Sequence, residues 1–143
     1  MPPALLDIHE YNGPGYRPLV DFDHWRVAVL NFSADLLPEH LTSMQRHNDT
    51  DEVFVLLAGR CILFTGEGTD TVTRIHAEDL QPNRVYNVRQ GVWHTHTLSP
   101  DARVLVVENR DTTYDNSPFT PLTDPQMGEI ARLTGELWAE PGE

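Results

Sequence analysis

The sequence has one cysteine, few basic residues and no long apolar run. Cys61 cannot form an internal disulfide or a multi-cysteine metal site, and a lone thiol in an apolar stretch is usually a buried core residue. Lysine and arginine total 10 against 22 acidic residues, so the formal net charge is -12. Such a charge repels phosphate backbones and anionic lipid, which argues against nucleic acid and membrane partners. No window approaches the length of a membrane-spanning helix and no targeting segment is recognisable, so we expect a cytoplasmic protein.

The length of 143 residues suits one domain with a sizeable core. Residues 1–20 are rich in proline and glycine, which predicts an irregular N-terminal arm. Residues 21–115 carry short apolar runs separated by turn residues, and residues 116–143 form an extension with a helix over about 125–139.

Short runs rich in β-branched and aromatic residues recur through the middle of the chain, a rhythm typical of an all-β domain. Eight strands in a chain of this size predict a jelly-roll barrel. The expected strands are Trp25–Phe32, Leu41–His47, Glu52–Leu57, Cys61–Thr65, Thr71–His76, Arg84–Val88, Val92–Leu98 and Arg103–Glu108.

The expected helix begins with Asp124 as N-cap and Pro125 as first helical residue. Its apolar residues share one face at helical spacing. They are Met127, Ile130, Leu133, Leu137 and Trp138. We expect this face to pack on the barrel, and a dedicated partner-binding helix is the alternative.

Histidines and one glutamate are spaced so that a barrel could bring them together. Gln45 and His47 share one face of their predicted strand, because strand side chains alternate. Glu52 begins a strongly apolar run, where an unpaired charge would be costly and a bound cation is one possible partner. His94 and His96 share a face of a later strand.

The first of these segments resembles a motif of the cupin superfamily, Gly, five residues, His-x-His, three or four residues, Glu, six residues, Gly. Gln45, His47, Glu52 and Gly59 fit this spacing. The chain departs from it at two positions, with Glu39 in place of the leading glycine and Gln45 in place of the first histidine.

The later segment resembles the second cupin motif, Gly, five residues, Pro-x-Gly, two residues, His, three residues, Asn. Gly91 and His94 keep their motif positions, whereas Asn83, Arg89 and Leu98 replace the first glycine, the proline and the asparagine. The resemblance covers about Leu41 to Leu98 by motif, and it implies the cupin jelly-roll fold.

The resemblance also implies a divalent metal ion on His47, Glu52 and His94, with Gln45 as a further possible ligand through its carbonyl oxygen. Two histidines and one carboxylate with open positions suit Fe(II), while zinc, manganese or nickel would also be accepted. The alternative is a barrel without metal, in which Glu52 is paired to Arg46, Arg60 or Arg89.

Residues beside the metal set are candidates for substrate chemistry. His96 is expected to face the barrel interior and to move protons near neutral pH, and a core histidine with one satisfied nitrogen is the alternative. Phe54, Tyr86 and Trp93 are expected to wall a substrate pocket.

The cupin resemblance does not define a reaction, because this fold hosts many functions. The leading hypothesis is a small metal-dependent enzyme acting on a polar metabolite such as a sugar or a keto or hydroxy acid, through isomerase-like or dioxygenase-like chemistry. The alternatives are a non-catalytic small-ligand-binding or sensor protein and a structural role through dimer formation. Apolar residues in the arm, among them Leu5, Leu6 and Ile8, favour a homodimer, with packing on their own barrel as the alternative.

Overall fold

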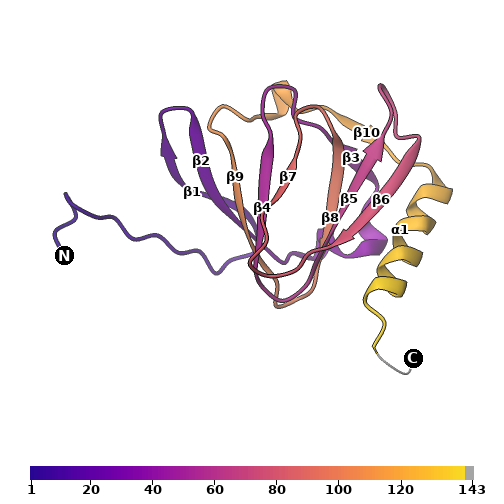
Figure 1. Cartoon of the computed structure of the whole chain (residues 1–143), viewed down its shortest axis with the longest axis horizontal. Helices are drawn as coiled ribbons and strands as arrows, with labels where there is room; N and C mark the ends of the chain where they lie inside the picture. Colours follow the sequence, from indigo (N-terminus) through magenta and orange to yellow (C-terminus); the bar gives the residue numbers. More distant parts are fainter. Residues whose placement is uncertain (141–143) are drawn as a thin grey trace.

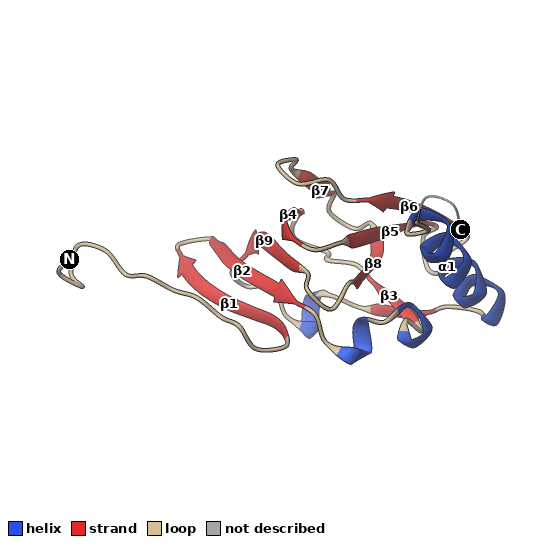
Figure 2. Ribbon diagram, turned by 90° about the horizontal axis from the view of Figure 1, so that it is seen from below, coloured by secondary structure: helices blue, strands red, loops and turns tan. Residues whose placement is uncertain are grey.

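The computed structural model describes residues 1–140, which form ten strands, three 3-10 turns and one α-helix. The first sheet has the order β1-β2-β9-β4-β7, and the second has the order β10-β3-β8-β5-β6. All pairings in both sheets are antiparallel, and the two sheets face each other as a jelly roll (Figures 1 and 2). The predicted all-β fold is confirmed.

The first sheet contains β1 (Gly15–Phe22), β2 (Trp25–Asn31), β4 (Glu52–Ala58), β7 (Tyr86–Val88) and β9 (Arg103–Asn109). The second contains β3 (Ser43–Gln45), β5 (Cys61–Glu67), β6 (Arg74–Asp79), β8 (Trp93–Leu98) and β10 (Phe119–Pro121). The 3-10 turns η1 (Ala34–Leu36), η2 (Pro38–His40) and η3 (Tyr114–Asn116) connect strands, and α1 (Asp124–Leu137) follows β10.

Two apolar clusters form the core on opposite faces of β5. Cys61 and Leu63 face the first sheet, where they join Phe54 and other inward residues. Ile62 and Phe64 face outward into a second cluster that includes Ile130 of α1. Because α1 covers this outer face (Figure 1), β5 is buried on both sides, as its unbroken apolar run requires.

The helix packs on the barrel as expected. Ile130 is fully buried, and Met127, Leu133 and Trp138 pack against the second cluster. The predicted N-cap is wrong by one residue: Thr123 is the cap, because its side chain accepts a hydrogen bond from Gln126 N and Gln126 returns one to Thr123 N.

The N-terminal arm is shorter than expected, because residues 15–22 are not irregular but form β1. Pro18 is compatible with this strand because β1 lies at a sheet edge and its pairing shifts between Pro18 and Val20. Tyr11 and Gly13 are hydrogen-bonded to Asn31 of β2, and residues 1–10 extend away from the barrel (Figure 1).

Several predicted strand limits also differ. β3 ends at Gln45, so His47 lies in the following loop. β6 starts at Arg74 instead of Thr71, because the turn after β5 is longer and contains Gly68 at φ 123°. β7 starts at Tyr86, because Asn83 adopts a left-handed turn at φ 67°. The short strand β10 was not expected.

No helix in residues 1–140 has the length and apolar character needed to cross a bilayer.

Gly59 provides a test of the turn between β4 and β5. It has φ 67°, and a Cβ there would lie 2.6 Å from Ala102 Cα. We expect Gly59→Ala to lower the free energy of unfolding by more than about 2 kcal/mol, from strain and a backbone clash. Denaturant unfolding followed by circular dichroism measures this change.

Gly128→Ala is the matched control, because Gly128 is exposed on α1 with no atom within 4 Å of an added Cβ. That substitution should raise stability by about 0.5–1 kcal/mol through helix propensity. Equal effects of the two substitutions would contradict the assigned turn.

Candidate metal centre and cavity

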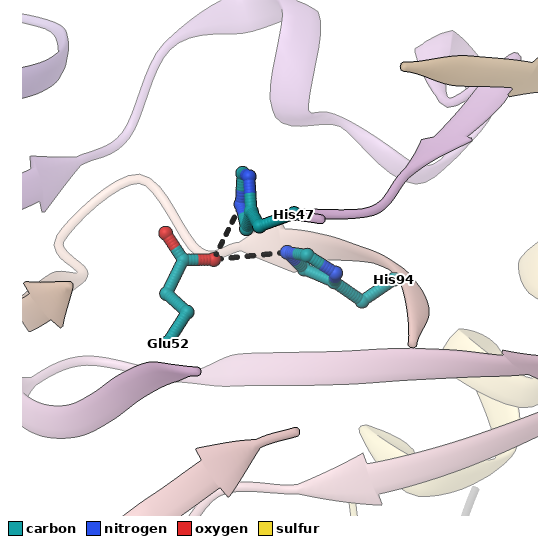
Figure 3. Close-up of side chains that lie close together, drawn as sticks. All are labelled: His47, Glu52 and His94. Atoms are coloured by element: carbon teal, nitrogen blue, oxygen red, sulfur yellow. Dashed lines mark hydrogen bonds and ion pairs between the residues drawn. The ribbon is translucent and has the colours of Figure 1, made fainter. Parts of the chain in front are cut away.

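Three residues from separate parts of the barrel converge on one point (Figure 3). Glu52 is the first residue of β4, His94 lies in β8, and His47 lies in the loop after β3. Their relative exposures are 8% for His47, 7% for Glu52 and 4% for His94. One candidate ligand atom from each lies within 4.8 Å of the others. The predicted grouping of these three side chains is therefore present.

Backbone hydrogen bonds fix the loop that carries His47. Arg46 N donates to Pro118 O at 3.1 Å, and Asn48 N donates to Asn116 O at 2.9 Å. Gly91 N donates to His47 O at 2.9 Å. Since Gly91 lies just before β8, this last bond holds the loop next to the strand that bears His94.

Both imidazoles direct Nε2 toward the same carboxylate oxygen (Figure 3). Glu52 Oε1 lies 3.2 Å from His47 Nε2 and 2.9 Å from His94 Nε2. The His47 and His94 ring centroids are 5.0 Å apart.

The other nitrogen of each ring is bonded to an acceptor. His94 Nδ1 lies 3.0 Å from Val92 O, which can only accept. His47 Nδ1 lies 2.7 Å from Ser117 Oγ, whose own proton is donated to Asn116 Oδ1. With Nδ1 as the donor to these acceptors, each ring directs Nε2 at Glu52 either as a donor, when the ring is protonated, or as a lone pair, when the ring is neutral. Two lone pairs facing a carboxylate require a proton or a cation between them, and the donor set fits a divalent cation.

A second carboxyl group, Glu108, lies beside Glu52. The antiparallel register pairs Val53 of β4 with Val107 of β9, which makes Glu52 and Glu108 neighbours across the strands. Burial and then a hydrogen bond with Glu52 raise the pKa of Glu108 to about 8. Burial also opposes ionisation of Glu52, but hydrogen bonds from His47 and His94 outweigh it and hold the pKa of Glu52 well below its usual range.

Gln45 is oriented by Ser117, the residue that also contacts the His47 ring. It lies opposite His94 in the pairing of β3 with β8. Its Nε2 donates to Ser117 O at 3.0 Å, so its carbonyl oxygen is the group left for a ligand or cation.

A cavity of about 710 Å³ opens over these residues. Gln45, His47, Glu52, His94 and His96 all line it. Tyr16, Arg26 and Glu108 also line it, and the Tyr16 hydroxyl donates to Glu108 Oε1. The volume is in the range of pockets for small molecules.

His96 faces the cavity on the same side of β8 as His94, in line with the alternation of strand side chains. Its Nδ1 is buried without a hydrogen-bond partner, and its ring packs 5.9 Å from that of Phe54. The expectation of a pKa near neutrality is wrong, because burial lowers the pKa of His96 to about 4.

Of the three expected pocket walls, only Phe54 lines the cavity. Trp93 lies in the outer cluster under α1, because it precedes His94 in β8 and so points to the opposite face. Tyr86 packs on the inner core from the edge strand β7, and its hydroxyl accepts a hydrogen bond from Gln81 N.

The alternative pairing of Glu52 with an arginine is not observed. Arg46 donates to Thr69 O and stacks over Trp93, while Arg60 pairs with Asp79. Arg89 lies near Asp51. In the described part of the chain, the hydrogen-bond partners of the Glu52 side chain are His47, His94 and Glu108.

Three site residues were missed from the sequence. Glu108 could have been found, because alternation along the predicted strand places it on the inner face with Val104 and Val106. Tyr16 and Ser117 lie in segments expected to be irregular, so no pattern pointed to them.

Comparison with known proteins supports the fold. No model of a known protein family matches the sequence, and no curated protein matches it. A cupin-2 domain protein from Shewanella frigidimarina is similar, with a TM-score of 0.50, 17% identity, and coverage of 75% of this chain and 87% of that chain.

Two further solved structures are similar to this chain. A variant of Streptomyces Pac13, a nucleoside dehydratase, with uridine has a TM-score of 0.56 and 9% identity, over 83% of this chain and 87% of that chain. CapF with an inhibitor has a TM-score of 0.58 and 13% identity, over 79% of this chain and 34% of that chain. At these identities the similarity concerns the fold, and this chain has the fold of the cupin superfamily.

Proposed function

We propose that this cupin binds one divalent metal ion through His47, Glu52 and His94, and that it is an enzyme acting on a small polar metabolite. The observation that supports the metal most strongly is the direction of the two imidazoles. Both Nε2 atoms face Glu52 Oε1, while both Nδ1 atoms are bonded to acceptors. The set of two nitrogens and one carboxylate suits zinc, Fe(II), manganese or nickel, with Gln45 as a further oxygen donor.

A bound divalent ion supplies Lewis-acid chemistry at substrate oxygens, or oxygen activation if it is redox-active. The protein supplies the remaining groups. Tyr16 and Glu108 form a hydrogen-bonded pair that can orient a substrate hydroxyl, and Phe54 excludes water from the inner wall.

His96 remains our candidate for proton transfer because its Nδ1 has no partner among residues 1–140. Its pKa of about 4 leaves the ring neutral at physiological pH and makes it a weak base, so the case for His96 depends on its position in the cavity. A residue that transfers a proton suits isomerase-like chemistry, in which a proton moves between adjacent carbons, better than dioxygenase-like chemistry. A non-catalytic ligand-binding or sensor protein is the competing function.

The metal site can be tested by titrating metal-free protein with Zn²⁺, Mn²⁺, Ni²⁺ and, without oxygen, Fe²⁺. We expect one ion per chain, measured by calorimetry and elemental analysis. Ser117→Ala should weaken binding by about 10- to 100-fold, because it frees His47 Nδ1, and loss of a ligand in His94→Ala should weaken it further.

His76→Ala is the matched control, because this exposed imidazole also bonds a carboxylate, that of Glu67, but lies outside the cavity. It should bind metal like the unmodified protein. Unchanged affinity in His94→Ala, with folding verified by circular dichroism, would reject the proposed site.

Catalysis can be tested with sugars, sugar phosphates, and keto and hydroxy acids on metal-loaded protein, combined with oxygen-uptake assays. We expect turnover of an isomerase type, and His96→Ala should lower kcat by about 100-fold if His96 transfers a proton. His76→Ala is again the control. Absence of turnover across the panel would favour the non-catalytic function.

We also propose a homodimer that covers the N-terminal arm. Leu5, Leu6 and Ile8 are 75%, 50% and 83% exposed, and the arm extends beyond its own barrel (Figure 1). Arg103 and Asn31 hold the base of the arm through hydrogen bonds to Tyr11 O, which fixes where it leaves the barrel. Apolar side chains this exposed need another surface to cover them.

Analytical ultracentrifugation tests the dimer at micromolar concentration. The complete chain should sediment as two copies, and deletion of residues 2–10 should shift it toward one. A single-chain mass for the complete protein would contradict the dimer.

A further inference from the structure

Two exposed aromatic rings stand at the mouth of the cavity. Tyr114, at the start of η3, is 82% exposed, and Phe119, at the start of β10, is 55% exposed. Both line the cavity, and their ring centroids are 6.0 Å apart at an interplanar angle of 34°. Rings this exposed contribute little to the core, so their packing surface is available to a ligand.

Among the described residues, the one arginine that lines the cavity is already paired with a carboxylate. The chain contains no lysine, and Arg26 is the one arginine among the described residues that line the cavity. Its Nε and one terminal nitrogen donate to the two oxygens of Asp21, at 2.8 and 3.2 Å. Asp21 therefore occupies one of the two guanidinium edges that make two-point contacts, and Tyr16 also hydrogen-bonds this side chain, so Arg26 is already committed to protein partners.

The remaining charges around the cavity are acidic. Asp35, in η1, and Glu52 both line the cavity. His40, also in the lining, has its Nδ1 bonded to Ala34 O at 2.7 Å. Such a lining disfavours an anionic group that is not itself bound to the metal.

Groups that bind hydroxyls lie deeper in the cavity. The Gln45 carbonyl oxygen is free of the bond that its Nε2 makes with Ser117 O, and His96 Nδ1 is buried without a partner. A buried polar atom such as His96 Nδ1 is normally hydrogen-bonded, so a ligand hydroxyl or a water is expected to satisfy it.

We propose that the cavity recognises an uncharged sugar ring, free or as part of a nucleoside, and discriminates against its phosphorylated form. The ring packs its apolar face against Tyr114 and Phe119, and its hydroxyls reach the polar interior. This inference rests on the proposed function, because it names the substrate class of the same cavity. It narrows the class by disfavouring sugar phosphates and keto or hydroxy acids.

The test measures binding of matched pairs to the full chain by calorimetry and ligand-observed NMR. The pairs are ribose with ribose 5-phosphate and adenosine with its 5′-monophosphate, which separate a free sugar from a nucleoside. We expect at least one uncharged member to bind about tenfold more tightly than its phosphate, because the phosphate brings negative charge next to acidic groups of the lining. Lack of binding by both uncharged members, or equal or tighter binding of both phosphates, would overturn the inference.

Substitutions locate the interaction. Tyr114→Ala and Phe119→Ala should each weaken binding of the uncharged ligand by about three- to tenfold, the usual scale for one aromatic contact. Phe22→Ala is the matched control, because Phe22 is 65% exposed and also pairs with another ring, Trp25, but does not line the cavity. A loss in Phe22→Ala equal to the loss in Tyr114→Ala and Phe119→Ala would count against the aromatic platform.

Asp35→Lys should reduce the preference for the uncharged ligand by roughly fivefold, because it replaces a negative charge near the mouth with a positive one. An unchanged preference would contradict the electrostatic part of the inference.

Each measurement is made on metal-loaded and on metal-free protein, with metal content determined separately. If the metal binds but the phosphates bind equally well, this inference fails and the metal proposal stands. If no metal binds, the metal proposal fails, and the comparison in metal-free protein still decides the ligand class.

Discussion

A buried carboxylate governs the interior of this barrel. Glu52 starts a strand whose next inward residues are Phe54 and Leu56, so its charge lies at the edge of an apolar core. Removal of an isolated carboxylate from water costs many kcal/mol unless it is paired and hydrogen-bonded. His47 and His94 supply that pairing, and each is held by its own backbone and side-chain contacts. The loop after β3, the start of β8 and Ser117 all contribute to holding these three side chains in one arrangement.

The architecture separates this polar interior from the parts that stabilise the fold. The inner cluster around Phe54 and Leu63 fills the space between the sheets and forms one wall of the cavity through Phe54, and a second cluster lies on the outer face under α1. The free energy gained by burying apolar side chains on both faces of β5 offsets the cost of burying the polar groups of Glu52, Glu108 and the histidines. The cavity can therefore carry unpartnered polar atoms such as His96 Nδ1 without loss of the fold.

Much of the fold could be predicted from local patterns, and the grouping of His47, Glu52 and His94 could be predicted from the spacing of the two motifs that resemble those of cupins. The period of two along β8 placed His94 and His96 on one face, and the same rule should have excluded Trp93 from the cavity. Glu52 was identifiable as a charged residue at the head of an apolar strand. By contrast, the contact of Glu52 with Glu108 depends on the register of β4 with β9, which joins residues 56 positions apart.

Residues from segments without periodic patterning could not be predicted in the same way. Ser117 reaches His47 because the chain after η3 returns along the loop that follows β3, a long-range contact with no sequence signature. Tyr16 enters the cavity because residues 15–22 form an edge strand in spite of Pro18. Burial sets the pKa of His96, so the residue type alone suggested a value too close to neutrality.

The most direct measurement is anomalous X-ray scattering from crystals of protein purified without chelator or added metal, with data collected on both sides of the candidate absorption edges. The account predicts one anomalous peak between the three side chains, about 2.0–2.2 Å from His47 Nε2, His94 Nε2 and a Glu52 carboxylate oxygen. Direct hydrogen bonds from both imidazoles to Glu52, with no anomalous peak even after the crystals are soaked in the candidate metals, would contradict it.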